Sequence, residues 1–417
     1  MKATHTAIYV TGNTNKDKIV QELYNGSLLL PNCNLQNLNG AVYSTLTINE
    51  LIKEELVHEH FDVATENKVS LVTSSGGQQK KALLNYLLAK NPGYIIIDDV
   101  FDNLDAASQQ AIVTTLQQVA HRIIIIQVLN RKKDILPFIT NLFTLKDKQL
   151  TAGLNENETG DSGYFTGTIP APLHPYALQK NPLVQFTDVC VSYNNVPVVK
   201  NICWQINNGE FWQLAGPNGS GKSTLLSMIF GDNAKAYGQN LILFGIRKGS
   251  GESVWDIKEK IGYFNSNITQ QFDRMDSIEQ MIISGFNDSI GLYLKPTDLQ
   301  IKLAAQWLQL LHLHNVKHQP FRNFSLAQQR LILVARAMVK HPPLLILDEP
   351  TAGLDDESAI LFTSLVNKIA AESTTAILYV SHRVENGLSP KFIFELIPGT
   401  DGSTGIYSKA KQKITDQ

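Results

Sequence analysis

The stretch GPNGSGKST, from Gly216 to Thr224, decides the fold of this 417-residue chain. It matches the pattern G-x-x-x-x-G-K-[ST], and it lies between a β-rich run, Phe211–Ala215, and a helix-forming run, Leu225–Phe230. Glycines between a strand and a helix let backbone N–H groups close around phosphate oxygens at the helix N-terminus. The stretch therefore predicts a phosphate-binding loop in an α/β fold.

The loop supplies most of the nucleotide contacts that the sequence predicts. Lys222 would reach the β- and γ-phosphates, and Ser223 would offer its hydroxyl to Mg²⁺. The predicted nucleotide-binding set in this loop is Gly216, Pro217, Asn218, Gly219, Ser220, Gly221, Lys222, Ser223 and Thr224.

Three other short β-rich runs lie before turn or helix signals: Ala7–Thr11, Tyr94–Ile97 and Leu344–Leu347. Continuous apolar runs of this kind suit the buried strands of a parallel sheet. Helical periodicity follows the phosphate loop and recurs at Leu331–Val339. The alternation of strand and helix signals predicts α/β architecture in both halves of the chain.

The two halves repeat one another. SSGGQQKKALLNYLLAKNPGYIIIDDVFDNLD, from Ser74 to Asp105, corresponds without a gap to FSLAQQRLILVARAMVKHPPLLILDEPTAGLD, from Phe324 to Asp355. A match of this length in constant register is hard to explain by convergent patterning of helices and strands. We therefore infer a duplication.

Glycines and prolines gather between the two halves, from Thr151 to Pro182, where apolar periodicity is weak. This composition is typical of a linker. We therefore expect a first domain at 1–150, a linker at 151–182 and a second domain at 183–417.

Motifs around the phosphate loop resemble those of the ATP-binding-cassette (ABC) superfamily. LLILDEP, Leu344–Pro350, resembles its Walker B strand, and AGLD, Ala352–Asp355, resembles its D-loop. VSH, Val380–His382, resembles its histidine switch. The resemblance implies two cassettes of P-loop NTPase fold in tandem, the first shortened and degenerate, with ATP and Mg²⁺ as ligands.

The resemblance also implies roles for single residues of the second domain. Asp348 would hold Mg²⁺ through water, Glu349 would polarise the attacking water, and His382 would approach the γ-phosphate. With Lys222, Glu349 and His382 form the predicted catalytic set, while Ser223 and Asp348 form the metal set. In VSY, Tyr193 stands where the family stacks an aromatic ring on adenine.

The second domain departs from the family pattern at two positions. Ser266 lies where the family has the glutamine of its Q-loop. The LSGGQ signature appears as Phe324 to Gln328, with Leu326 and Ala327 in place of both glycines. Carbon side chains there would keep backbone N–H groups away from a γ-phosphate.

The first domain lacks the nucleotide-binding and catalytic residues that the second domain has. Its phosphate loop would be GNTNKDKIV, in which Lys18 aligns with Lys222. Asp17 would repel a triphosphate, and Ile19 cannot ligate a metal ion. Asp99 replaces the catalytic glutamate and Asn130 replaces the switch histidine. We predict that this domain does not hydrolyse ATP unaided.

The first domain nevertheless keeps an intact signature, Ser74-Ser75-Gly76-Gly77-Gln78, and a D-loop aspartate, Asp105. In cassette ATPases two domains pair head to tail, and each signature loop covers the nucleotide on the opposite phosphate loop. The resemblance thus implies one working site, in which Ser75, Gly76, Gly77, Gln78 and Asp105 complete the nucleotide site of the second domain. In a second, vestigial site, Ala327 would lie opposite Lys18.

Two further stretches, Gly249–Ser266 and Ser284–Tyr293, resemble tandem-cassette ATPases of the ModF type, which are associated with molybdate transport and are also called photorepair proteins. This resemblance implies a cytoplasmic ATPase, peripheral on the inner face of the plasma membrane where it meets a permease supplied by another chain. Residues Asp276–Phe321 would form the helical region that meets a partner in this superfamily. Its apolar positions are Met281, Ile282, Trp307, Leu308 and Leu311, which we interpret mainly as core.

Composition limits the other possibilities. The apolar runs are far shorter than the ~20 residues that cross a bilayer, and a net charge of −2 gives no general attraction to nucleic acid. The scattered Cys33, Cys190 and Cys203 are typical of reduced thiols in a cytosolic protein.

Two alternatives to a transport ATPase stay open at this point. One is a tandem cassette that acts on ribosomes or nucleic acid, although the linker is neither long nor charged. The other is a nucleotide-controlled regulatory protein that hydrolyses little, which Ser266 favours.

Overall fold

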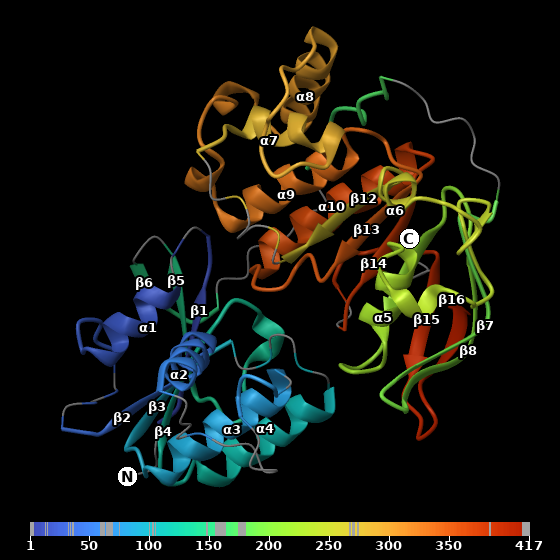
Figure 1. The fold of residues 1–417 in the computed structure, drawn as a ribbon. Coiled ribbons are helices and arrows are strands. Elements are labelled where there is room, and N and C mark those ends of the chain that lie inside the picture. The colour runs from blue at the N-terminus through green and yellow to red at the C-terminus, as the bar shows by residue number, and fades with distance from the viewer. Residues whose placement is uncertain are drawn as a thin grey trace, which may run out of the picture. The chain divides into compact units, whose positions relative to one another are not determined.

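The chain forms two compact units in a computed structural model (Figure 1). The structure describes residues 4–410, except 13, 15, 32, 34, 36, 59–62, 64–69, 75, 100, 102–103, 105, 147–148, 155–163, 174–180, 267, 269–271, 273–274 and 383–384. The first unit comprises Met1–Gly160 together with Gly353–Asp356. The second comprises Asp161–Ala352 and Glu357–Gln417.

The first unit is built on one six-stranded sheet of order β2-β3-β4-β1-β5-β6. All neighbouring strands are parallel except β5 and β6, which are antiparallel. Its elements are β1 (Thr6–Val10), α1 (Lys16–Tyr24), β2 (Gly40–Tyr43), α2 (Thr45–His58), α3 (Gly76–Ala89), β3 (Tyr94–Asp98), α4 (Ala106–Val119), β4 (Ile124–Leu129), η1 (Lys132–Asp134), β5 (Asn141–Lys146) and β6 (Gln149–Ala152).

Alternate residues of β3 face two different hydrophobic clusters, which explains why this strand is apolar throughout. Ile95 and Ile97 belong to a cluster with residues of α3 and α4, whereas Tyr94 and Ile96 belong to a cluster with residues of α1. Since successive side chains of a strand point to opposite faces, helices cover both faces of the sheet. The β-rich run Tyr94–Ile97 is thus confirmed as a central parallel strand.

The second unit has a six-stranded sheet of order β12-β13-β14-β9-β15-β16 and a four-stranded antiparallel sheet of order β11-β10-β7-β8. Its strands are β7 (Val184–Tyr193), β8 (Val196–Ile206), β9 (Phe211–Ala215), β10 (Leu241–Leu243), β11 (Ile246–Arg247), β12 (Ile261–Asn265), β13 (Leu344–Asp348), β14 (Ala376–Val380), β15 (Phe392–Ile397) and β16 (Thr404–Lys409). Its α-helices are α5 (Lys222–Ile229), α6 (Val254–Lys258), α7 (Ile278–Ser284), α8 (Asp298–Leu310), α9 (Leu326–Met338) and α10 (Asp356–Glu372).

The two six-stranded sheets have the same strand order and the same directions, with only the last pair antiparallel in each. The agreement extends to the backbone. Asp99 and Glu349, which follow the corresponding strands β3 and β13, have φ values of 42° and 45°. Asn91 and His341, which precede these strands, have φ values of 47° and 51°. Among the residues that the structure describes, only the second unit adds an antiparallel four-stranded sheet.

The expected linker begins later than its composition suggested. Thr151 and Ala152 belong to β6 and pair with Thr144 and Phe143 of β5. A short edge strand needs only backbone partners and one neighbour, so weak apolar periodicity does not exclude it.

The helical region between β12 and β13 has its own core. Met281, Ile282, Trp307, Leu308 and Leu311 are all buried, so our interpretation of these residues as core is confirmed. Capping boxes begin α7 at Ser277, α8 at Thr297 and α9 at Ser325. Each of these helices therefore begins where a side-chain oxygen satisfies its unpaired N–H groups.

No helix among the described residues is long and apolar enough to cross a membrane.

The two exposure extremes among the tryptophans give a test of this core. Trp307 is 0% exposed and Trp255 is 79% exposed. Trp307→Ala should lower the free energy of unfolding by about 3–5 kcal/mol, because it removes buried area and leaves a cavity. Trp255→Ala should change it by less than about 0.5 kcal/mol. Urea unfolding followed by circular dichroism measures both, and equal effects would contradict the assignment of Trp307 to the core.

His341 gives the second unit a pH-dependent stability. Burial lowers the pKa of His341 from 6.5 to about 4, although a hydrogen bond with the backbone of Pro170 opposes this shift. Between these two values the unfolded chain binds a proton that the folded chain does not. The free energy of unfolding should therefore fall as the pH falls from 6.5 towards 4, by at most about 1.4 kcal/mol per pH unit from this residue.

His341→Asn should flatten that pH dependence, because asparagine does not titrate and tolerates the left-handed backbone at this position. Urea unfolding at a series of pH values gives the comparison. Identical slopes for wild type and His341→Asn would refute the assignment.

Candidate active site

Glycine geometry shapes the phosphate loop of the second unit. The loop leaves β9 at Ala215 and enters α5 at Lys222. Gly216, Gly219 and Gly221 have φ values of 145°, 77° and 94°, which favour glycine. A Cβ atom at Gly221 would lie 2.5 Å from Cγ1 of Val199. A residue with a side chain could not replace Gly221 without displacing its neighbours.

The loop leaves polar groups available to an anion. Gly221, the N-cap of α5, provides no side-chain hydrogen bond to the first turn of the helix. Ser220 Oγ is buried and makes no hydrogen bond, and Ser223 is exposed in the first turn. Lys222 Nζ donates hydrogen bonds to the carbonyl oxygens of Gly216 (2.7 Å) and Pro217 (2.9 Å). A helix N-terminus and a lysine fit the phosphates of a nucleotide.

A pair of acidic side chains ends the neighbouring strand β13. Burial, and after it the negative charge of Glu349, raise the pKa of Asp348 to about 6, although the positive charge of Lys222 acts in the opposite direction. A buried carboxylate beside a second carboxylate favours a cation. The donor set of Asp348 and the Ser223 hydroxyl therefore fits Mg²⁺, which takes oxygen ligands.

His382 lies against the second acidic residue. Its Nδ1 atom is 3.0 Å from Oε1 of Glu349. The contact follows from the fold, because β13 and β14 are parallel neighbours and both residues lie just beyond the carboxyl ends of these strands. Three predicted residues, Lys222, Asp348 and Glu349, thus interact electrostatically, and His382 joins them by a direct contact.

Tyr193 ends β7, and its side chain is 40% exposed. Its hydroxyl accepts a hydrogen bond from Nδ2 of Asn233 at 2.8 Å, a contact that the sequence reasoning missed. Asn233 carried no motif, and nothing in its local sequence relates it to Tyr193.

The signature of the first unit begins helix α3 at Gly76. A Cβ atom at Gly76 would meet nothing within 4 Å, and one at Gly77 would lie 3.5 Å from Ser108 Oγ. Gln78 is exposed. The predicted site residues Ser75 and Asp105 lie outside the described residues. In the corresponding turn of the second unit, Ser325 caps α9 through Gln328, and Leu326 is 41% exposed.

The predicted counterpart of Lys222 in the first unit is wrong. Helix α1 begins at Lys16, so Lys16 and not Lys18 occupies its first position, as Lys222 does in α5. Lys16 Nζ lies 2.9 Å from Asp98 Oδ1 and also pairs with Asp99. Lys18 is 60% exposed and pairs with Glu22 in the same helix. The sequence alignment assumed that the loops before the two helices have the same length, whereas the observed helix starts show that their lengths differ.

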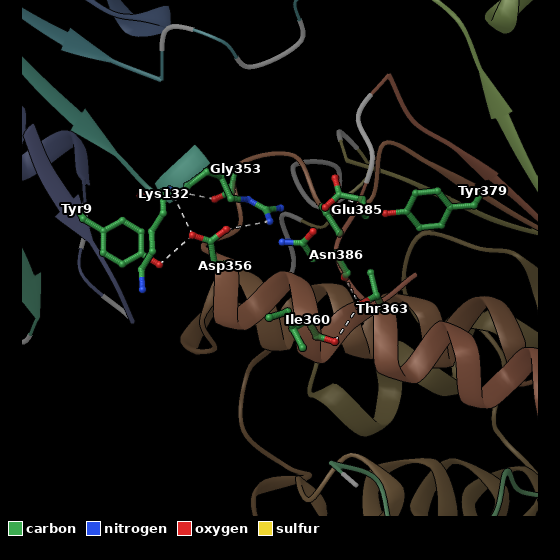
Figure 2. A network of polar contacts seen from close by, with 12 residues as sticks. Tyr9, Lys132, Gly353, Asp356, Ile360, Thr363, Tyr379, Glu385 and Asn386 are labelled. Atoms are coloured by element: carbon green, nitrogen blue, oxygen red, sulfur yellow. Dashed lines mark hydrogen bonds and ion pairs between the residues drawn. The ribbon is translucent and has the colours of Figure 1, made fainter. Parts of the chain in front are cut away.

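The segment Gly353–Asp356, which contains the end of the predicted D-loop, belongs to the first unit. The Asp356 carboxylate accepts hydrogen bonds from the Tyr9 hydroxyl (3.2 Å) and the backbone N–H of Lys132 (2.9 Å), as Figure 2 shows. Asn130, the counterpart of the switch histidine, donates from Nδ2 to the carbonyl of Gly353 at 3.2 Å. Polar groups at the carboxyl ends of β1 and β4 thus hold this segment.

Comparisons with known proteins agree on one family. Residues 199–352 match the ABC transporter family. The chain is 39% identical over 359 residues to the ABC transporter ATP-binding protein ModF of Escherichia coli (strain K12), covering 82% of this chain and 72% of the relative. An uncharacterized ABC transporter ATP-binding protein of Schizosaccharomyces pombe is 30% identical over 322 residues, which cover 75% of this chain and 66% of the relative.

Other similarities cover about half of the chain. The zinc uptake system ATP-binding protein ZurA of Listeria innocua is 32% identical over 210 residues, covering 48% of this chain and 77% of the relative. A solved structure of cbiO1 from Clostridium perfringens, part of the ABC transporter complex cbiONQ, is also similar. The two share 22% sequence identity with a TM-score of 0.48, and the match covers 55% of this chain and 89% of cbiO1. By its match to ModF and by its matching family segment, this chain belongs to the ATP-binding proteins of ABC transporters, which are ATPases.

Proposed function

We propose that the chain hydrolyses ATP at a single site, built by the second unit and completed by the signature turn of the first, and that this cycle drives a transport partner. The observation that carries the proposal is the complete set of reactive groups in the second unit, Lys222, Asp348, Glu349 and His382, at the loop end of one sheet. The first unit keeps the signature glycines Gly76 and Gly77, which the second unit lacks.

Each side chain has a task that follows from its position. Lys222 would exchange its two carbonyl acceptors for phosphate oxygens, a stronger charge-assisted pairing. Glu349 would accept the proton of the attacking water, and His382, at 3.0 Å, would orient that carboxylate. Mg²⁺ bound by Ser223 and Asp348 would neutralise charge on the phosphates. Tyr193 would stack on the adenine.

We propose that the first unit is a degenerate cassette that arose by duplication. Its sheet has the strand order and directions of the second, and Asp99 has the left-handed backbone of Glu349. These shared features support common descent, and the gapless sequence repeat supports it independently.

Lys16 explains why this degenerate cassette would not hydrolyse ATP. Its ammonium pairs with Asp98 and Asp99, the counterparts of Asp348 and Glu349. A positive charge on the chain itself therefore lies where the second unit would attract a cation. A metal ion at this position would have to displace a lysine whose side chain is only 13% exposed.

The transport role rests on the relatives. The resemblance to the ModF type makes molybdate the proposed cargo, and a permease from another chain the proposed membrane partner, at the inner face of the plasma membrane. The tagged chain should then co-purify from native membranes with a molybdate permease. Recovery of ribosomes in its place would favour the tandem cassettes that act outside transport.

Turnover by variants tests the composite site. Lys222→Ala, Glu349→Gln and Gly77→Asp should each lower ATP turnover by at least about 100-fold, because each removes a catalytic group or blocks phosphate approach. Lys18→Ala should keep most of the activity, since Lys18 is exposed. Phosphate release measures all four. Equal loss in Lys18→Ala would mean that the assay reports general damage and not loss of the composite site.

Gly76→Ala tests whether the signature turn approaches the nucleotide, without disturbing the fold. A Cβ atom at Gly76 meets nothing within 4 Å, so the fold should tolerate it. Turnover should fall although the melting temperature is unchanged. Full activity in this variant would mean that the signature turn does not reach the nucleotide.

Lys16 and Lys18 form a matched pair for stability. Lys16→Met should lower the free energy of unfolding by about 3 kcal/mol, because it leaves two carboxylates without their cation. Lys18→Met should change it by less than about 0.5 kcal/mol, since exposed pairs contribute little. Urea unfolding compares them, and a negligible effect of Lys16→Met would contradict the role given to its ammonium.

A further inference from the structure

A chain of hydrogen bonds joins the ring of Tyr193 to the phosphate loop. Nδ2 of Asn233 donates to Tyr193 Oη (2.8 Å) and to Ser227 Oγ (2.9 Å). Ser227 Oγ in turn donates to the carbonyl oxygen of Thr224 at 2.8 Å. Thr224 is the last residue of the phosphate-loop motif. The series of hydrogen bonds therefore links the loop, through helix α5, to the end of β7.

Asn233 is itself held in place at the middle of this series of hydrogen bonds. It is 9% exposed, and its Oδ1 atom accepts a hydrogen bond from the backbone N–H of Lys235 at 2.9 Å. Its own backbone N–H donates to the carbonyl oxygen of Ser227 at 3.2 Å. With Oδ1 committed, both hydrogens of the amide remain for Ser227 and Tyr193, which matches the donor capacity of the group.

The Tyr193 ring lies at the tip of an exposed hairpin. Its strand ends in a tight hairpin, in which Tyr193 pairs with Val196, and both intervening residues, Asn194 and Asn195, have positive φ. The ring is 40% exposed, and Val196 is 63% exposed. A ring at such a tip can turn about its side-chain torsions unless a polar contact fixes its far end. The hydrogen bond from Asn233 fixes Oη, and Tyr193 stays partly exposed.

We infer that Asn233 is a positioning residue that sets the Tyr193 ring at a fixed distance from the phosphate loop, and thereby makes the site select a nucleoside triphosphate by its purine base. The inference rests on the proposed function, since it requires that Tyr193 stacks on the base. The span between base and phosphates is set by two loops, and this chain of hydrogen bonds couples them. A pyrimidine ring offers less surface to the fixed platform and gains less from it.

Steady-state turnover of ATP and CTP tests this role in Asn233→Ala, Tyr193→Phe and the double variant. Each single variant should raise KM for ATP roughly three- to tenfold, the loss expected for one hydrogen bond, and should leave kcat nearly unchanged. The preference for ATP over CTP should fall accordingly. The double variant should be no worse than either single variant, because both remove the same link.

Gln239→Ala is the matched control. Its carboxamide also contacts β7, donating to the carbonyl oxygen of Cys190 at 2.8 Å, but it does not contact Tyr193. It should leave KM and the preference for ATP unchanged. If Asn233→Ala fails to fold, Tyr193→Phe carries the test, since it removes one partly exposed oxygen and no ring atom.

The outcomes separate this inference from the proposed function. Absence of wild-type turnover, or turnover that survives Glu349→Gln, overturns the proposed function. Turnover that Glu349→Gln abolishes, with KM unchanged in Tyr193→Phe and Asn233→Ala, overturns the positioning role alone. Additive effects in the double variant, or a fall in kcat with KM unchanged, also overturn it.

Discussion

The second unit depends on the glycine-rich turn that leads from β9 into helix α5. Glycines in left-handed conformations turn the chain from β9 into this helix, and the N-cap, Gly221, provides no oxygen that would satisfy its first turn. Such a helix end requires an acceptor from outside. The surrounding groups fit a negatively charged one, because Lys222 lies beside the loop and the buried Ser220 hydroxyl makes no hydrogen bond.

Charge balance distinguishes the two units more clearly than shape does. At the carboxyl end of β13, Asp348 has a raised pKa, because burial and Glu349 disfavour its charge more than Lys222 favours it. At the carboxyl end of β3, Asp98 and Asp99 pair with Lys16. Two sheets of the same topology therefore present opposite conditions to a cation. In the first unit Lys16 pairs directly with both carboxylates, whereas in the second unit the ammonium of Lys222 donates to the carbonyl oxygens of Gly216 and Pro217.

Much of the fold could be predicted from the sequence, because buried parallel strands are continuous apolar runs. β1, β3, β9 and β13 were all predicted within one residue of their observed bounds. The contact between Glu349 and His382 follows from motif and strand order together. These features are local or repeat at a fixed spacing, which a sequence pattern can reveal.

The residues that the sequence did not reveal act through tertiary contacts. Lys16 was missed because the loop length that brings it to Asp98 depends on where α1 begins. Asn233 was missed because its partners belong to a hairpin and a helix that are separate in the chain. Neither residue is part of a recognisable motif. Side chains that position other groups are free to come from any element that packs nearby, so spacing does not predict them.

The left-handed residue after the central strand persists in both units, at Asp99 and at Glu349. A non-glycine residue in this conformation costs free energy, which surrounding structure must offset. Since the first unit keeps this cost without the glutamate, the strained exit belongs to the architecture of the sheet and not to the reaction. Under the duplication that we propose, one half of the chain can lose its chemistry by side-chain replacement alone. Its main chain stays constrained by packing, and so would keep the trace of the proposed duplication for longest.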